Sequence, residues 1–125
     1  MRGTIYTFRT KNFTVQFNAL PEDDLDLSWD EDGSTAEGLE SGELCAFCAQ
    51  VRVLFHGIEL GADYLGGCIY KRPEDFRDHL GVRQYSRELS EKHGREITVG
   101  SYFPSMVREA IREARENMER IKEAA

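Results

Sequence analysis

The sequence of 125 residues lacks the segments that would place it in a membrane or outside the cell. It has no apolar run of about 18 residues. It also has no signal-peptide core of about 7 to 15 apolar residues near its start. Its three cysteines, Cys45, Cys48 and Cys68, are too few for a disulfide scaffold. We therefore expect a soluble protein of the reducing cytoplasm, with no contact to a membrane.

Motifs that mark common enzymes are also missing. No G-x-G-x-x-G or G-x-x-x-x-G-K-[ST] sequence is present, so no phosphate loop is expected. His56, His79 and His93 have no Ser or Cys beside them in a nucleophile motif. We interpret these histidines as surface or helix-capping residues. The sequence predicts no catalytic residue, no cofactor and no enzymatic activity.

Basic residues are absent between Lys11 and Arg52, and this gap contains what we call the acidic segment, residues 21 to 43. Its acidic residues are Glu22, Asp23, Asp24, Asp26, Asp30, Glu31, Asp32, Glu37, Glu40 and Glu43. Taking these ten from the 23 acids of the chain leaves 13 against 16 Lys and Arg, so this segment accounts for the net charge of −7. Nucleic-acid binding depends on Lys and Arg. We expect a basic protein partner and no direct contact with nucleic acid.

What the sequence does contain is the pattern of a small α+β domain spanning residues 1 to 125. Alternating apolar residues predict strands at 4–9, 13–17, 44–55, 58–60 and 61–70, and a brief strand at 97–99. A hairpin is expected after the first strand, a turn at His56-Gly57 and a bulge at Gly66-Gly67. We predict a small antiparallel sheet of about four to five strands.

Three helices and one isolated helical turn are predicted. Pro73, with acids beside it in the first turn, starts a short helix to Leu80, and Tyr85 to Lys92 forms another. One helical turn is expected at 37–40. Residues 102 to 123 carry apolar residues at three- and four-residue steps and form a long amphipathic helix. We expect this helix to pack on the sheet. A coiled-coil homodimer is the alternative, although only about two heptads are available.

Within the acidic segment, Leu25, Leu27 and Trp29 alternate with acidic residues. This period of two predicts a short strand with its apolar side chains inward and its acids outward. Same-face acids of a strand lie about 6.6 to 6.8 Å apart, close to the phosphate spacing of a nucleic-acid strand. Asp24, Asp26 and Asp30 would lie on that face. The acidic segment would then imitate phosphates toward a basic channel of another protein.

Metal sites were weighed against these interpretations. Cys45-Ala-Phe-Cys48 with Cys68 and a histidine would give a Cys₃His zinc site, but residues three apart in a strand point to opposite faces. A redox C-x-x-C would need a helix N-terminus. A calcium loop with Gly33 at its sixth position places Leu39 where a bidentate Glu is needed. We predict buried structural thiols and no dedicated metal site, with weak cation binding by the acids as an alternative.

The stretches YTFRTKNFTV, DLDLSWDEDG and GADYLGGCIY resemble those of small acidic proteins that phages and mobile elements encode against host defence. The resemblance is to anti-CRISPR and anti-restriction inhibitors as a type, so it carries no residue roles. The resemblance implies a non-enzymatic inhibitor that acts in the host cytoplasm. The charge of the acidic segment adds the hypothesis that it binds a basic nucleic-acid-handling protein as a nucleic-acid mimic. The predicted partner-binding residues are Glu22, Asp23, Asp24, Asp26, Asp30, Glu31, Asp32, Glu37 and Glu40. The alternative is a structural or assembly protein that dimerises through its C-terminal helix, with an acidic segment that only solubilises it.

Overall fold

A four-stranded antiparallel sheet forms the centre of the computed structural model, which describes residues 3–22, 25–78, 84–85, 87–95, 98–99 and 102–124. Its strands lie in chain order: β1 (Gly3–Arg9), β2 (Thr14–Leu20), β3 (Cys45–Phe55) and β4 (Ile58–Tyr70). Two short strands, β5 (Gln84–Tyr85) and β6 (Thr98–Val99), pair with each other apart from this sheet. The sheet is therefore an up-and-down meander.

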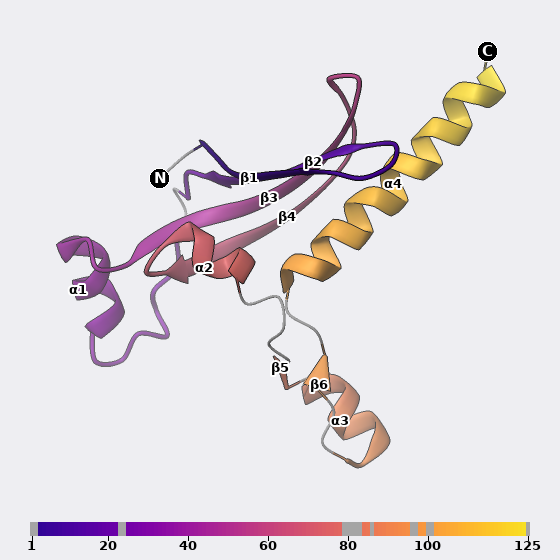
Figure 1. Ribbon diagram of the computed structural model, residues 1–125. Helices are drawn as coiled ribbons and strands as arrows, with labels where there is room; N and C mark the ends of the chain where they lie inside the picture. The colour runs from indigo at the N-terminus through magenta and orange to yellow at the C-terminus, as the bar shows by residue number, and fades with distance from the viewer. Residues whose placement is uncertain are drawn as a thin grey trace.

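Four helices accompany the strands: α1 (Ser34–Ser41), α2 (Pro73–Asp78), α3 (Arg87–His93) and α4 (Tyr102–Ala124). The long α4 crosses one face of the sheet, and α2 lies beside its first turn (Figure 1). α1 stands at the end of the sheet where β3 begins, whereas α3 lies with β5 and β6 away from the sheet (Figure 1). The predicted α+β class, with a long C-terminal helix on an antiparallel sheet, is confirmed.

The core lies between α4 and the face of the sheet formed by alternate residues of β2 and β3. Phe17 and Phe47 are almost completely buried there. The ring of Phe17 lies 5.5 Å from that of Phe76 in α2 and 5.4 Å from that of Phe103 in α4, measured between centroids. Aromatic contacts of this kind add to the hydrophobic gain of burial. This cluster holds both helices to the sheet.

At Gly61 the backbone of β4 approaches the backbone of α4 directly. A Cβ atom at this position would overlap the carbonyl oxygen of Ala110 and lie 2.8 Å from the nitrogen of Ala114. One turn further along α4, Asn117 donates a hydrogen bond from Nδ2 to the carbonyl of Leu60, at 2.6 Å. Small residues on both elements therefore set the distance between helix and sheet.

Outside the acidic segment, the predicted elements agree with the structure in type and differ at several ends. The strands predicted at 58–60 and 61–70 are one strand, β4. Gly66-Gly67 lies at a register shift between β3 and β4, so the predicted bulge is confirmed. The predicted helical turn at 37–40 is part of the longer α1. The helix predicted from Tyr85 begins later, at Arg87, and Tyr85 belongs to β5. The helix that starts at Pro73 ends at Asp78, and Leu80 lies outside the described residues, as does Ile97 of the predicted last strand.

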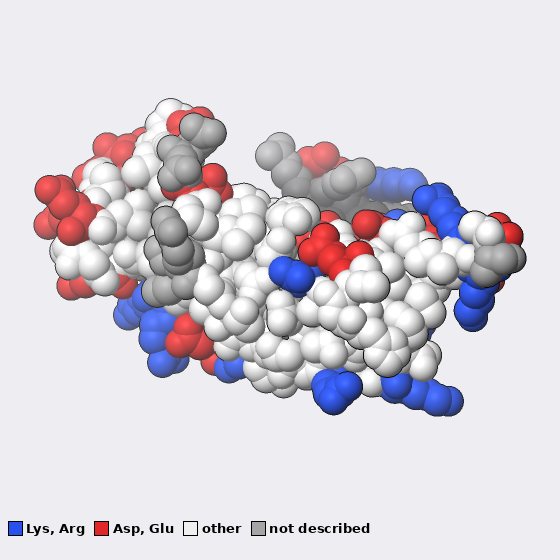
Figure 2. Space-filling model, turned by 90° about the horizontal axis from the view of Figure 1, so that it is seen from above, with Lys and Arg blue, Asp and Glu red and all other residues white. Residues whose placement is uncertain are grey.

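The meander places its connections at opposite ends of the sheet. The turns after β1 and β3, at residues 10–13 and 56–57, lie at one end, and the connection from β2 to β3 lies at the other. That connection contains the acidic segment. Figure 2 shows the resulting concentration of Asp and Glu at the end of the molecule where α1 lies. The sequence gap in basic residues thus becomes an acidic end of the folded protein.

Candidate functional site

The acidic segment contains no strand at residues 25–29, so that prediction is wrong. Instead, the chain turns at Ser28 and Trp29. The carboxylate of Asp26 accepts a hydrogen bond from the Ser28 amide at 2.9 Å, and the amide of Asp30 donates to the carbonyl of Leu27, also at 2.9 Å. A short acidic side chain that bonds to nearby backbone competes with strand pairing. Asp26 and Asp30 therefore do not share the face of a strand, and Asp24, the third acid of the predicted face, lies outside the described residues.

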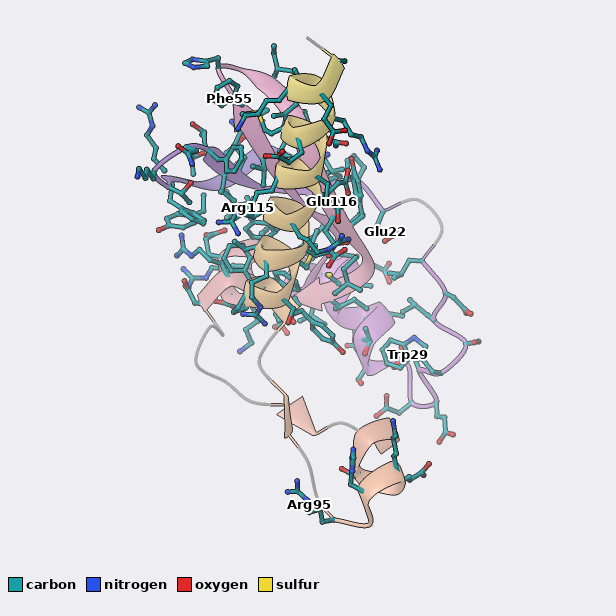
Figure 3. The ribbon with its side chains drawn as sticks, turned by 90° about the vertical axis from the view of Figure 1, so that its right-hand side faces the viewer. Glu22, Trp29, Phe55, Arg95, Arg115 and Glu116 are labelled. Carbon is teal, nitrogen blue, oxygen red and sulfur yellow. The ribbon has the colours of Figure 1, made fainter. Side chains whose placement is uncertain are left out.

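Trp29 points outward, where the sequence pattern predicted burial. Its side chain is 58% exposed, and its indole Nε1 donates to the carbonyl of Asp26 at 2.9 Å. Leu25 and Leu27 are half-buried. Figure 3 shows Trp29 on the loop beyond the edge of the sheet. The only tryptophan of the chain is thus held by the turn and presented to solvent.

Two further aspartates organise the start of α1. The carboxylate of Asp30 accepts hydrogen bonds from the amides of Thr35 at 3.3 Å and Ala36 at 3.0 Å. The carboxylate of Asp32 accepts one from the Ser34 amide at 2.9 Å. These amides belong to the first turn of the helix, where intrahelical partners are missing and negative charge is favourable. Both aspartates therefore stabilise the helix that follows them.

The same hydrogen bonds shift the acidity of two of these carboxyl groups. The Ser28 amide holds the pKa of Asp26 below its usual value of 3.8. The Ser34 amide does the same for the pKa of Asp32. A carboxylate that accepts backbone hydrogen bonds is favoured in its charged form. The negative charge of the acidic segment is therefore retained well below neutral pH.

Glu22 fastens the beginning of the acidic segment to the sheet. Its Oε2 accepts a hydrogen bond from the amide of Gly67 at 2.6 Å. Gly67 has a left-handed φ of 68°, which glycine adopts without strain. A Cβ atom at the neighbouring Gly66 would lie 3.1 Å from the same carboxylate oxygen. The bulge predicted from the glycine pair thus provides a close backbone approach for Glu22.

The remaining acids divide into exposed and undescribed residues. Glu31, Glu37, Glu40 and Glu43 are exposed, and within the described part of the chain their carboxylates have no hydrogen-bond or ion-pair partner. Asp23 and Asp24 lie outside the described residues. The nine predicted partner-binding residues therefore separate into local structural acceptors, free surface charges and two residues without a described position.

Beside Trp29 lies a hollow that the sequence pattern did not predict. A cavity of about 360 Å³ is bounded by Trp29, the glycine pair of β4, Tyr70, Phe76 and Tyr102, with Leu65, Cys68 and Ile69 completing its lining. A second cavity, of about 330 Å³, lies between Trp29 and the start of α1, lined also by Asp30, Glu31, Asp32, Ser34 and Thr35. One exposed indole therefore borders both an apolar and an acidic hollow. The signal in the sequence was a single Trp in a segment of acids.

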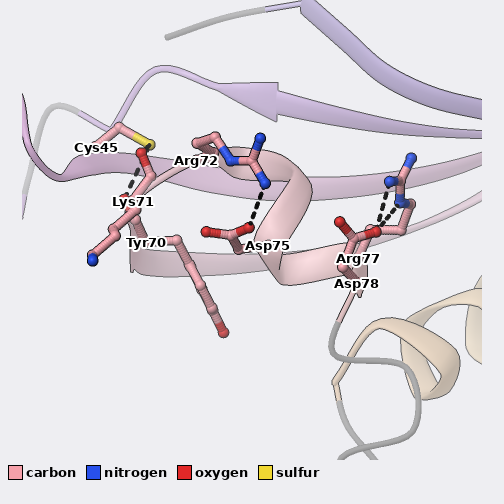
Figure 4. A network of polar contacts seen from close by, with 7 residues as sticks. All are labelled: Cys45, Tyr70, Lys71, Arg72, Asp75, Arg77 and Asp78. Carbon is pink, nitrogen blue, oxygen red and sulfur yellow. Dashed lines mark hydrogen bonds and ion pairs between the residues drawn. The ribbon is translucent and has the colours of Figure 1, made fainter.

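The three cysteines were predicted to be buried structural thiols, but Cys45 and Cys48 are only half-buried. Cys68 is buried, and its Sγ lies 3.3 Å from the carbonyl of Leu65. Cys45 is directed at the carbonyls of Tyr70 and Lys71, where β4 ends before α2 (Figure 4). Burial raises the pKa of all three thiols, that of Cys68 to about 11. Metal binding and nucleophilic attack require the thiolate, which is disfavoured here.

Among the described residues, no three His, Cys, Asp or Glu side chains are grouped so that they could hold a metal ion. The described helices include none long and apolar enough to cross a membrane.

The chain matches no protein-family model, and comparisons with curated proteins and with solved structures gave no match. The structure itself gives the fold class, an α+β protein with an antiparallel meander under one long helix. Its acidic connection carries an exposed Trp.

Proposed function

We propose that the protein is a non-enzymatic inhibitor of the anti-CRISPR or anti-restriction type. In this proposal the acidic segment binds a basic, nucleic-acid-handling protein or complex in the host cytoplasm. Trp29 supplies the central contact, and Glu31, Glu37 and Glu40 supply the surrounding charge. The observation that carries the proposal is an indole that is 58% exposed within a segment free of Lys and Arg.

Tryptophan supports the proposal because it is costly to expose and effective in interfaces. Residues that dominate binding energy are enriched in Trp, and they act best where a pocket and a surrounding rim exclude water. Trp29 already borders a cavity lined by Tyr70, Phe76 and Tyr102. A partner side chain that enters this cavity would bury the indole on one side. The fixed Asp26 turn reduces the entropy lost on binding.

The unpaired carboxylates of the acidic segment also support the proposed binding surface. The free carboxylates of Glu31, Glu37 and Glu40 need no internal bond to be broken before they pair with a partner's Lys or Arg. Concentrated charge of one sign speeds encounter with a surface of opposite sign, and salt screens this effect. Because residues 25–29 form no strand, mimicry of nucleic acid would rest on total charge and would not require regular phosphate spacing.

The alternative, dimerisation through α4, receives less support. The apolar side chains of Phe103, Met106, Ala110 and Ala114 are buried in the core, so most of the stripe is already occupied. Ile121, 56% exposed near the end of α4, is the residue that a coiled coil could still use. A monomer in sedimentation at micromolar concentration would contradict this alternative.

The test uses purified CRISPR effector complexes and restriction enzymes with labelled target DNA. We expect the wild-type protein to inhibit DNA cleavage by at least one of them, with a dissociation constant that rises steeply between 50 and 300 mM salt, a range of about six-fold in salt. The E31Q/E37Q/E40Q variant should bind at least about tenfold more weakly. W29A should do the same with little change in salt dependence.

The matched control is E113Q/E119Q/E123Q, which changes the net charge equally on exposed positions of α4. This variant should inhibit like the wild type. Equal inhibition by the wild type and E31Q/E37Q/E40Q would show that the acidic segment is not the binding surface. Failure of the wild type to slow any of the nucleases would contradict the proposed class of target.

A further inference from the structure

The end of the sheet opposite the acidic segment contains a basic cavity. Its volume is about 410 Å³, and it lies between the turn after β1 and the turn after β3. Arg9 and Lys11 come from the first turn, and His56 comes from the second. The complete lining is Arg9, Thr10, Lys11, Asn12, Phe13, Thr14, Leu54, Phe55, His56 and Gly57, with no acidic side chain among them.

The cations of this cavity are available to a ligand. Within the described residues, neither Arg9 nor Lys11 has an ion-pair partner, and both are exposed. The nearest acid along the strands is Glu59, which lies opposite Leu54 in the register of β3 and β4. Its carboxylate is 3.4 Å from Nε of Arg52 and is therefore already paired. An anion in the cavity would meet Arg9 and Lys11 without an adjacent competing carboxylate.

The first turn holds its cations on a fixed backbone. The amide of Thr10 donates to the carbonyl of Phe13 at 2.9 Å, and the amide of Phe13 donates to Oγ1 of Thr10 at 3.1 Å. These two bonds close the turn on both sides of Lys11. A preorganised turn binds a ligand with a smaller loss of entropy than a mobile one.

The second turn places a histidine in an unusual conformation. His56 has a φ of 49°, and among the described residues it is the one non-glycine residue with a positive φ. Two-residue hairpin turns with positive φ at both positions favour Asn-Gly or Asp-Gly, and His is less suited to the first place. The imidazole is held against the ring of Phe55, with centroids 4.3 Å apart. Phe55 in turn contacts the ring of Phe13 edge-on at 6.5 Å.

The apolar part of the cavity is small and comes from Phe55. Phe13 and Leu54 are each only 7% exposed and add little surface, whereas Phe55, labelled in Figure 3 near the end of β3, is half-buried. Cationic and hydroxyl groups therefore lie beside one accessible aromatic ring. A ligand that satisfies both parts must combine a compact anion with an apolar or aromatic body.

We propose that this cavity binds a small organic phosphate. Its phosphoryl group is held by Arg9, Lys11 and His56, and its body lies on Phe55. Arg and Lys are the usual partners of phosphate oxygens, and a cavity of this volume is within the range that small-molecule sites occupy. The eleven residues of β3 place the acidic segment on the order of 35 Å away, several Debye lengths at physiological salt. The negative net charge of the chain therefore does not prevent binding here.

The test is calorimetric titration of the full chain with AMP, inorganic phosphate and adenosine at about 0.1 M salt. We expect AMP to bind most tightly, inorganic phosphate more weakly and adenosine not measurably. R9Q/K11Q should lose at least about tenfold in AMP affinity, because two charge-assisted contacts are removed. H56N should weaken binding as well and still fold, because Asn tolerates the left-handed conformation.

The matched control is R120Q/K122Q, which removes one Arg and one Lys from exposed positions near the end of α4. This control should bind AMP like the wild type. Equal affinity of R9Q/K11Q and the control would overturn the proposal, and so would adenosine binding as tightly as AMP. A DNA duplex that binds more tightly than AMP and depends on Arg9 and Lys11 would also overturn it, in favour of a nucleic-acid contact.

Discussion

Gly61 is the residue at which the sheet and α4 come closest, and its role follows from the absence of a side chain. The sequence indicated only that glycines interrupt the fourth strand. Which glycine lies beneath a helix depends on how α4 crosses β4, and that contact joins residues about fifty positions apart. The outward orientation of Trp29 could not be predicted from the sequence pattern either, because its indole bonds to the backbone carbonyl of Asp26 within a turn.

G61A should therefore destabilise the protein by about 1 to 3 kcal/mol, because the added methyl group must push α4 away from the sheet. Urea unfolding followed by circular dichroism measures this loss. G66A is the matched control in the same strand. Its methyl group would meet only the carboxylate at the far end of the Glu22 side chain, which can shift at lower cost than the backbone of a helix, so we expect a smaller loss. Equal losses in the two variants would contradict the close packing at Gly61.

At the scale of elements, hydrophobic periodicity predicted the main sheet and α4 well, since both bury one apolar face over many residues. The same rule failed for Leu25, Leu27 and Trp29. Three alternating residues gain little by forming a strand, and Asp26 and Asp30 offer the backbone local bonds instead. Charge located the candidate site, whereas the hollow beside Trp29 is formed by residues from β4, α2 and α4 and could not be predicted from local sequence.

The hydrogen-bonded aspartates predict how the acidic segment responds to pH. Asp26 and Asp32 have pKa values below 3.8 in the folded protein. Their contribution to stability is therefore present above that value and is lost as the pH falls through the lowered pKa. Fluorescence of Trp29, the only tryptophan, should change as the pH falls below 3.8, before the sheet unfolds. D26A should already show an altered signal at pH 7, and an unchanged signal in D26A would contradict this assignment.

At the scale of the whole molecule, the acidic segment and the hydrophobic core are separate. The core contains residues of β2, β3, β4, α2 and α4, and none of the described residues between 20 and 44 belongs to it. The acidic segment is joined to the sheet through Glu22 and through the start of β3. Changes in the sequence of the acidic connection should therefore leave the packing of the sheet unchanged.

This separation predicts that the acidic segment can be removed without unfolding the rest. Replacing residues 23–42 by about five Gly and Ser residues keeps Glu22 and should change the free energy of unfolding by less than about 1 to 2 kcal/mol, since shorter loops cost little entropy to close. Binding to a basic partner should be lost, while AMP binding at the opposite end should persist. Calorimetric unfolding and titration of the same variant measure both. Unfolding of this variant would contradict the prediction, because it would show that the acidic segment contributes to the stability of the sheet.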